Sequence, residues 1–342
     1  MVPTIRDCLS VTPPKRPPPS ASPPAVKFSV IVPLYNKAPY ITRTLLSVVA
    51  QRHADFELIV VDDGSSDDGP ALVERIGDPR IRLVRQPNAG VSVARNTGMA
   101  QAGGDWIAFL DGDDWYHPDC LAHQAQTIQR HPQARIVATG FTIMEDRPDW
   151  NPQAWPVAEP KYEVIDCLPA RWLRSAPFFT GSVAIRRDLL RATEPKFPAG
   201  ENYGEDIDLW FRVAAQAPVV LSDQSLVAYR RSTPNGLITT ANREDVAPSV
   251  KRMHLAAEAS PAGDANGAAL LRFVTHEYIS HARVNTSVGK RARALDLLLT
   301  VWKPGLRERR WWVSILMALC VPRSTLRRWQ NRRMGRAGAA PL

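Results

Sequence analysis

Short, continuous apolar runs alternate along this chain with stretches in which apolar residues recur every three or four positions. Continuous runs are typical of strands buried on both faces, and the longer spacing is typical of helices that pack one face. Two runs, Phe28–Pro33 and Phe56–Val61, flank an apolar stripe formed by Ile41, Leu45, Val48 and Val49. This segment predicts a right-handed βαβ unit with both strands in one parallel sheet.

The same alternation continues for about 220 residues. Further strands are predicted at Ile81–Val84, Trp106–Leu110, Arg135–Phe141, Ser182–Ile185 and Val219–Leu221, and further helices at Val91–Ala102 and Leu121–Arg130. We therefore expect an α/β fold with a mostly parallel central sheet flanked by helices. From about residue 265 the apolar positions have helical spacing only, which predicts a helical C-terminal extension that Pro304-Gly305 closes.

Composition and charge change this picture mainly at the two ends. The chain has 342 residues and 44% hydrophobic content, enough for one large core. Eight prolines within residues 1–27 predict a disordered or polyproline arm. Residues 303–342 hold ten Lys and Arg and one acid, so this segment carries the whole net charge of +9. The expected domains are the arm (1–27), a catalytic domain (28–240), a helical extension (241–306) and a basic amphipathic tail (307–342).

The basic tail contains an apolar stretch, Trp311–Val321, between arginines. Eleven helical residues span about 16 Å, whereas a bilayer core is about 30 Å thick, so this stretch cannot cross a membrane. It could lie in the interface of an anionic membrane, or it could pack on the catalytic domain. We expect no nucleic-acid partner, because no known binding module appears.

The cysteines and the N-terminus suggest a compartment. None of the four cysteines forms a C-x-x-C pair, and the first 27 residues lack an apolar signal core. We therefore expect a cytoplasmic protein, with possible peripheral attachment to the cytoplasmic face of the membrane through the tail.

Two acidic turns follow predicted strands. Asp62 and Asp63 end one strand, and Asp111-Gly112-Asp113-Asp114 follows another. Ligands of open α/β sheets gather at the carboxyl ends of strands, so the two turns could share one crevice. Carboxylates this close repel one another, and Mg²⁺ or Mn²⁺ would relieve the repulsion. The alternative is a pair of solvated turns that cap the following helices.

A third acidic segment, Gly204–Arg212, precedes an apolar helical stretch. Its acids could simply favour the positive end of a helix dipole, or one of them could be a general base for a hydroxyl. The chain has neither a G-x-x-x-x-G-K-[ST] loop nor a G-x-G-x-x-G fingerprint. A P-loop NTPase and a dinucleotide dehydrogenase are therefore disfavoured.

Together these segments resemble glycosyltransferase family 2, whose members are inverting enzymes with the GT-A fold. The resemblance runs from about Phe28 to Thr240. It rests on five segments in the family's order: Ser29–Lys37, Val61–Ser65, Asn88–Asn96, Asp111–Asp114 and Gly204–Arg212. It implies transfer of a sugar from a nucleotide-sugar donor, most often a UDP-sugar, to a hydroxyl of a glycan or lipid-linked acceptor.

The resemblance also implies roles for residues that bind the donor nucleotide. Pro33 and Tyr35 would line the base pocket, with Tyr35 beside the ring. Asp63 would bind the base, and Asp62 would support its loop. Arg95 would lie near the donor phosphates.

For the residues near the reacting groups, the resemblance implies that Asp111 contacts the donor ribose or sugar and also helps to bind the metal. Asp113 would be the main ligand of Mg²⁺ or Mn²⁺. Asp206 would be the catalytic base, with Glu205 beside it at the acceptor.

The chain departs from the family in two places. A Tyr-Arg-x-His stretch that often ends the domain reads Tyr229-Arg230-Arg231-Ser232 here, without the His. Water and diphosphate could complete the metal shell, or Arg230 or Arg231 could neutralise the phosphates. The Gln-x-x-Arg-Trp motif of processive synthases is absent, which favours the addition of one sugar at a time.

Two other functions compete with an active sugar transferase. A catalytically inactive sugar-nucleotide-binding or scaffold protein of the same fold gains weight from the missing His. A nucleotidyltransferase is disfavoured, because Pro33–Lys37 does not match that class's Gly-rich signature.

Overall fold

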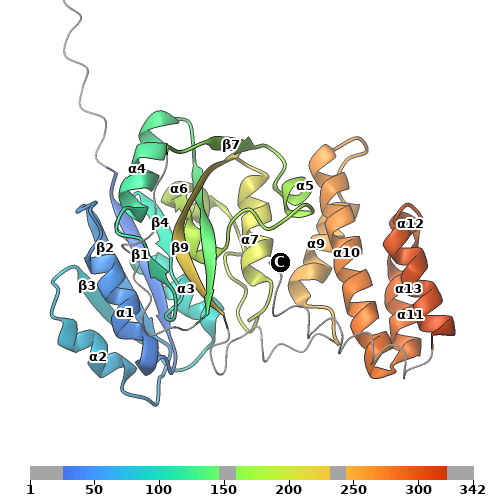
Figure 1. The fold of residues 1–342 in the computed structure, drawn as a ribbon, viewed down its shortest axis with the longest axis horizontal. Coiled ribbons are helices and arrows are strands. Elements are labelled where there is room, and N and C mark those ends of the chain that lie inside the picture. The colour runs from blue at the N-terminus through green and yellow to red at the C-terminus, as the bar shows by residue number, and fades with distance from the viewer. Residues whose placement is uncertain (1–25, 146–158, 232–243, 322–342) are drawn as a thin grey trace, which may run out of the picture.

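A computed structural model of the protein describes residues 26–145, 159–231 and 244–321 (Figure 1). Within these ranges nine strands form one sheet in the order β3-β2-β1-β4-β8-β6-β9-β5, and β7 pairs with β9. Strands β3, β2, β1 and β4 are mutually parallel, and β8 runs antiparallel between β4 and β6. The mostly parallel sheet predicted from the apolar runs is confirmed.

The seven predicted strands are present, although β9 extends well beyond its predicted end, and β5 and β7 had not been predicted. The strands are β1 (Phe28–Leu34), β2 (Phe56–Asp62), β3 (Ile81–Arg85), β4 (Trp106–Phe109), β5 (Trp115–Tyr116), β6 (Ile136–Glu145), β7 (Tyr162–Ile165), β8 (Val183–Arg186) and β9 (Val219–Arg231).

Helices cover both faces of the sheet and then continue as a helical extension. They are α1 (Ala38–Val49), α2 (Gly69–Ile76), α3 (Val91–Gln101), α4 (Cys120–Arg130), α5 (Leu168–Trp172), α6 (Arg187–Ala192) and α7 (Glu205–Ala214), followed by α9 (Pro248–Glu258), α10 (Ala265–Val288), α11 (Arg291–Thr300), α12 (Trp302–Gly305) and α13 (Arg309–Cys320).

Alternate residues of the central strands serve two hydrophobic clusters, one on each face. On β1, Val30 and Val32 pack with α1, α2 and α4, whereas Ile31 faces α3, α6 and α7. Strand residues point alternately to opposite faces, so a continuous apolar run can fill both clusters. The carboxyl ends of β1, β2 and β4 are thereby fixed at one edge of the sheet.

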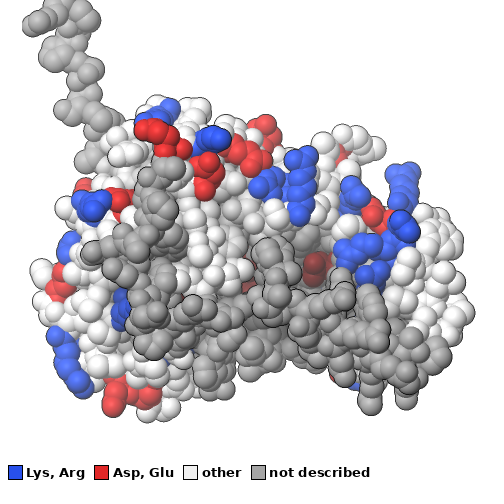
Figure 2. All heavy atoms as spheres, viewed as in Figure 1, with Lys and Arg blue, Asp and Glu red and all other residues white. Residues whose placement is uncertain are grey.

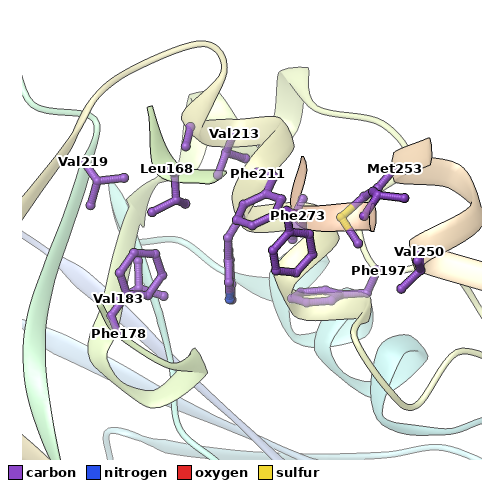
Figure 3. Close-up of a cluster of buried hydrophobic side chains, with 14 of the residues drawn as sticks. Leu168, Phe178, Val183, Phe197, Phe211, Val213, Val219, Val250, Met253 and Phe273 are labelled. Carbon is purple, nitrogen blue, oxygen red and sulfur yellow. The ribbon is translucent and has the colours of Figure 1, made fainter. Parts of the chain in front are cut away.

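The helical extension shares a core with the sheet domain. Phe211 of α7 and Phe273 of α10 lie edge to face with their ring centroids 5.0 Å apart, and Met253 of α9 belongs to the same cluster (Figure 3). Helix α13 packs on α10 and α11 with Trp311, Ser314 and Ala318 buried. One face of Trp311–Val321 therefore packs mainly on α10 and α11 of the helical extension, not on the catalytic domain as one interpretation expected, and its attachment to a membrane stays a prediction.

Two predictions fall wholly or largely outside the described residues. These concern the proline-rich arm (1–27) and the part of the basic tail beyond residue 321. One prediction is wrong: Pro304-Gly305 does not close the helical region, because it lies in α12 and α13 follows. None of the described helices combines the length and hydrophobicity that a bilayer span needs.

Candidate active site

The loops after β1 and β2 are tied to each other at the carboxyl edge of the sheet. The Asn36 amide oxygen accepts a hydrogen bond from the Ser66 backbone N–H at 2.8 Å, and the Asp67 carboxylate accepts one from the Ala38 N–H at 2.8 Å. Asn36 has φ 51°, a left-handed conformation that Asn tolerates better than most residues. This tie leaves Tyr35 half exposed at the mouth of the crevice.

Asp62 and Asp63 are both buried and organise neighbouring loops. The Asp62 carboxylate accepts a hydrogen bond from the Ser65 N–H at 3.0 Å. Asp63 accepts backbone N–H bonds from Ala89 at 2.9 Å and Gly90 at 2.8 Å. Asp63 therefore fixes the loop that enters α3. Its contact with a nucleobase stays a prediction.

The Asp111–Asp114 turn follows β4 and reaches across to the end of β1. The Asp113 carboxylate accepts a hydrogen bond from the Lys37 ammonium at 2.5 Å, and both side chains are partly exposed. Gly112 permits this approach, because a Cβ there would lie only 3.1 Å from the Pro33 carbonyl oxygen. The turn therefore brings the segment from Pro33 to Lys37 and the Asp113 carboxylate into contact.

Asp114 and Arg230 fix the back of this turn. Asp114 is fully buried, and its carboxyl accepts the Arg230 backbone N–H at 2.7 Å. Burial raises the pKa of Asp114 well above its ordinary value, and the charges of Asp113 and Asp111 add to this effect. The Arg230 guanidinium is sandwiched between the Tyr40 and Trp115 rings and donates to the Asp113 carbonyl at 3.0 Å. Arg230 thus supports the turn from behind.

Arg95 joins the turn to the third acidic segment. It is 3% exposed, and its guanidinium donates to Asp111 at 2.9 Å and to Glu205 at 2.7 Å. Burial alone would lower the pKa of Arg95, but the charges of Asp111 and Glu205 outweigh it, so Arg95 stays a cation. Its expected contact with donor phosphates stays a prediction, since both terminal nitrogens are engaged by carboxylates.

Glu205 and Asp206 occupy the first turn of α7, as the helix-dipole interpretation expects. Burial, together with the charge of Asp206, raises the pKa of Glu205 to about 7. Asp206 is only partly buried, and its carboxylate accepts a hydrogen bond from the Thr180 hydroxyl at 2.7 Å. Thr180 lies in a short 3₁₀ helix before β8, so a different part of the sheet orients this carboxylate.

The carboxylates of the turn match the chemistry of a hard divalent cation. Asp111 and Asp113 each use one oxygen for Arg95 or Lys37, which leaves one oxygen of each without a partner among the described residues. In the same residues no group of three or more His, Cys, Asp and Glu has metal-binding geometry. Two carboxylates suit Mg²⁺ when substrate phosphates supply further oxygens.

A sequence model of glycosyl transferase family 2 matches residues 29–192, the stretch that holds the first four motifs. This stretch, slightly under half of the chain, therefore supports the predicted resemblance to glycosyltransferase family 2. It is 30% identical to the glycosyltransferase EpsJ of Bacillus subtilis over 215 residues, which cover 61% of this chain and 62% of EpsJ. It is 46% identical to the succinoglycan biosynthesis protein ExoO of Rhizobium meliloti over 133 residues, 37% of this chain and 36% of ExoO. The chain therefore covers less than two thirds of these relatives.

Solved structures with the same fold extend beyond the family match. TarS 1–349 of S. aureus in complex with UDP-GlcNAc superposes with a TM-score of 0.66 and 21% identity, over 91% of this chain and 92% of that one. The Pyrobaculum calidifontis mannosyltransferase PcManGT, in complex with GDP-Man and Mn²⁺, gives a TM-score of 0.54 and 18% identity, over 93% and 91%. The likeness confirms the predicted GT-A fold.

The fold brings together most of the residues that the sequence singled out. Asp111, Arg95 and Glu205 form one connected set, although 110 positions separate Arg95 from Glu205, and Asp206 follows Glu205 in the same helix turn. Two contacts of this candidate site, those of Lys37 and Thr180, had not been predicted. Lys37 lies in the Ser29–Lys37 segment that carries the family resemblance, so the sequence could have marked it as a site residue. Nothing in the sequence marks Thr180.

Proposed function

We propose that the protein is an inverting glycosyltransferase that moves one sugar at a time from a nucleotide-diphospho-sugar, with UDP the favoured carrier. The observation that carries the proposal is the pair of contacts made by the Asp111–Asp113 turn: Asp113 binds Lys37, and Asp111 is linked through Arg95 to Glu205. These contacts connect a turn that bears two carboxylates to the helix that presents Asp206. The relatives named as glycosyltransferases and the UDP-sugar bound to a protein of the same fold support this assignment.

Asp206 acts as the general base. Its partial exposure gives an acceptor hydroxyl access to the carboxylate, and the Thr180 hydroxyl holds that carboxylate in one orientation. As Asp206 takes the proton, the acceptor oxygen attacks the anomeric carbon and the bond to the nucleoside diphosphate breaks. A single in-line displacement of this kind inverts the anomeric configuration.

The donor diphosphate lies at the Asp111–Asp113 turn. Asp113 and Asp111 would hold Mg²⁺ or Mn²⁺, which supplies positive charge to the departing diphosphate. Lys37 adds a cation of the protein's own beside Asp113. Arg230 is buried behind the turn, which argues against direct contact between its guanidinium and the phosphates. Completion of the metal shell by water and diphosphate stays the other proposal, and the Arg231 side chain lies outside the described residues.

The acceptor is a glycan or a lipid-linked glycan, and we propose that the protein reaches it from the cytoplasmic face of the membrane. Seven large apolar side chains on α11–α13 and their connections are more than 40% exposed: Leu299, Trp302, Leu306, Trp312, Val313, Leu316 and Leu319. Exposed Lys303, Arg307 and Arg309 interrupt this apolar flank. That pairing suits an anionic lipid surface, such as the cytoplasmic leaflet.

Two substitutions test the division of labour. Asp206→Asn removes the base but keeps the shape, so UDP should bind with unchanged affinity in Mn²⁺ while sugar transfer is lost. Asp113→Asn should instead weaken the Mn²⁺-dependent binding of UDP itself, measured by calorimetry with and without the metal. If Asp206→Asn transfers sugar at the wild-type rate, the base is another residue.

The competing proposal is a catalytically inactive protein that binds sugar nucleotides. A thermal-shift screen of UDP-glucose, UDP-galactose, UDP-GlcNAc and GDP-mannose, with and without Mn²⁺, separates the two when it is followed by assays of the sugar nucleotide that binds. Stabilisation without any release of nucleoside diphosphate favours the inactive protein. Stabilisation with release names the donor and supports the transferase.

A further inference from the structure

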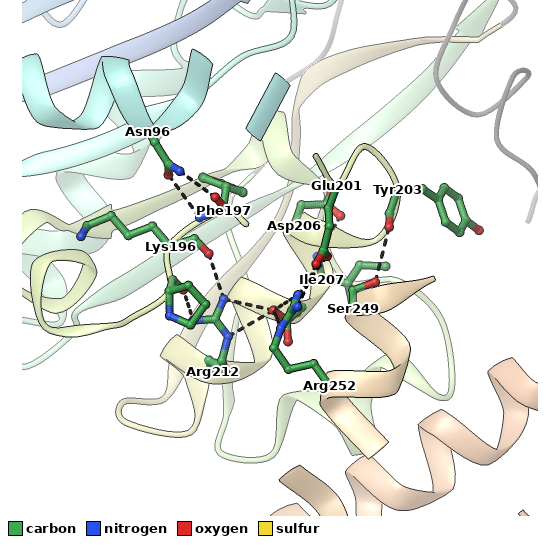
Figure 4. A network of polar contacts seen from close by, with 12 residues as sticks. Asn96, Lys196, Phe197, Glu201, Tyr203, Asp206, Ile207, Arg212, Ser249 and Arg252 are labelled. Carbon is green, nitrogen blue, oxygen red and sulfur yellow. Dashed lines mark hydrogen bonds and ion pairs between the residues drawn. The ribbon is translucent and has the colours of Figure 1, made fainter. Parts of the chain in front are cut away.

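We infer that the helical extension positions the catalytic base through Arg252 of α9. This inference rests on the proposed role of Asp206. It gives α9, which lies outside the family match at residues 29–192, a role in positioning Asp206. The contacts that carry it lie in the loop before α7 and in the first two turns of α7 (Figure 4).

Arg252 binds two carboxylates that flank the base. Its two terminal nitrogens donate to the two carboxylate oxygens of Glu201 at 2.8 and 2.9 Å, which is the bidentate geometry that fixes orientation as well as distance. Its Nε donates to Asp208 at 3.0 Å. Glu201 stands five residues before Asp206 and Asp208 two residues after it, so one guanidinium holds both sides of the base.

Burial makes these contacts hard to replace by water. Asp208 is 1% exposed and Glu201 is 9% exposed. Without Arg252, Glu201 loses the guanidinium that binds both of its carboxylate oxygens, whereas Asp208 keeps its contact with Arg212. The backbone around Glu201 then shifts to hydrate the uncompensated carboxylate. Removal of Arg252 therefore disturbs the start of α7 more than the loss of a surface ion pair would.

The loop that Arg252 holds is also anchored to α3, the helix that carries Arg95. The Glu201 carbonyl accepts a hydrogen bond from the Ser92 hydroxyl of α3 at 2.5 Å, and the Phe197 carbonyl accepts one from the Asn96 amide at 2.6 Å. Arg212 of α7 shares Asp208 with Arg252 and donates to the Lys196 carbonyl at 2.9 Å. Residues 195–208 are therefore held between the helix that carries Arg95 and the extension.

Helix α9 touches the loop at a second point. The Ser249 hydroxyl donates to the Tyr203 carbonyl at 3.4 Å and lies where a side chain on Gly204 would stand. Gly204 is the residue immediately before Glu205 and Asp206. Ser249 and Arg252, one turn apart on α9, thus fix the position of the first turn of α7, which carries Glu205 and Asp206.

The test compares Arg252→Ala with Arg272→Ala, which breaks another ion pair of the extension, to Glu308 at 2.7 Å. In Arg252→Ala, amide hydrogen exchange over residues 195–208 should rise at least tenfold. The kcat for UDP release from the UDP-sugar that the protein uses should fall about 10- to 100-fold, as for a misplaced reacting group. The Kd for UDP in Mn²⁺ should stay within twofold. Arg272→Ala should change none of the three.

Conservative variants separate positioning from folding. Arg252→Lys keeps the charge but loses the bidentate contact, so its kcat should lie between those of the wild type and Arg252→Ala. Glu201→Gln should lower kcat, and its effect should not add to that of Arg252→Ala. If Arg252→Ala only lowers Tm while exchange over 195–208 and kcat below the transition are unchanged, the inference is wrong.

Failure of the proposed function and failure of the Arg252 inference give different results. Full transfer by Asp206→Asn would remove the base assignment, whatever Arg252 does. Loss of transfer in Asp206→Asn combined with wild-type exchange and kcat in Arg252→Ala would leave the function standing and overturn only the clamp.

Discussion

Glu205 is a carboxyl group under two opposing influences. Burial and the charge of Asp206 favour its protonated form, while the guanidinium of Arg95 favours the carboxylate. The first two prevail, and the pKa rises to about 7. At neutral pH a proton can therefore be present or absent on Glu205, directly beside the proposed base, and the folded protein binds this proton more tightly than the unfolded chain does.

Glu205→Gln should change how stability depends on pH. Between the unfolded pKa of 4.5 and the folded pKa of about 7, the native protein keeps a proton that the unfolded chain loses. The free energy of unfolding of the wild type therefore falls as pH rises through this window, by at most about 1.4 kcal/mol per pH unit from this group. The variant lacks that contribution. Its free energy of unfolding in urea, relative to that of the wild type, should therefore increase between pH 4.5 and pH 7.5.

Asp55→Asn is the matched control, because Asp55 is exposed in the loop before β2. Its stability should run parallel to that of the wild type across the window. If the stability of Glu205→Gln also runs parallel to that of the wild type, the pKa of Glu205 is not raised. Burial and Asp206 would then not outweigh Arg95 as argued above.

Individual site residues were predictable where a motif marked them and unpredictable where only tertiary structure did. Asp63, Asp111 and Asp206 stood out as acids at strand ends or at a helix start. The contact between Arg95 and Glu205 spans 110 positions, and no local pattern carries such a pairing. The same holds for Thr180, a hydroxyl in a segment with no acidic or glycine signal.

The start of α7 is set by the backbone of Gly204. This residue has φ 73°, in the left-handed region that glycine adopts without strain. A Cβ here would also lie 2.9 Å from the Ser249 hydroxyl of α9. The helix that carries Glu205 and Asp206 therefore depends on a glycine for two reasons, backbone conformation and contact with the extension.

Gly204→Ala should reduce activity more than Gly200→Ala. Gly200 also has a left-handed backbone, with φ 79°, but nothing lies within 4 Å of a Cβ there. Both variants bear a strain of about 1–2 kcal/mol, and only Gly204→Ala pushes α9 away from α7. We expect similar losses of Tm but a lower kcat for Gly204→Ala alone, partly restored by Ser249→Ala. Equal kcat values would mean that contact with α9 does not matter.

The elements themselves were largely predictable, because the apolar runs are long. Strands β1, β2 and β3 begin where the sequence places them. The short elements were not found. Strand β5 has two residues and exists through its pairing with β9, while α2, with eight residues, lies outside the predicted helices. Such elements have too few residues for a period to appear.

At the scale of the whole molecule, the helical extension has two different faces. One face completes the core of the sheet domain through Phe273, Val274 and Met253. The other, on α11–α13, leaves large apolar side chains in solvent. Figure 2 shows uncharged atoms over this end of the molecule, with Lys and Arg beside them. Scattered apolar residues are normal on a surface, but seven in one short stretch mark an interaction site.

Leu316→Glu combined with Leu319→Glu should weaken binding to anionic vesicles without unfolding the protein. Both side chains are more than half exposed on α13, so the change removes lipid contact and adds repulsion without opening the core. In sedimentation with phosphatidylserine–phosphatidylcholine vesicles, the bound fraction should fall at least fivefold. Leu255→Glu, at an equally exposed leucine of α9, should bind as the wild type does. Equal binding by all three proteins, or a double variant that instead converts a dimer into a monomer, would assign this apolar flank to a protein partner rather than to the membrane.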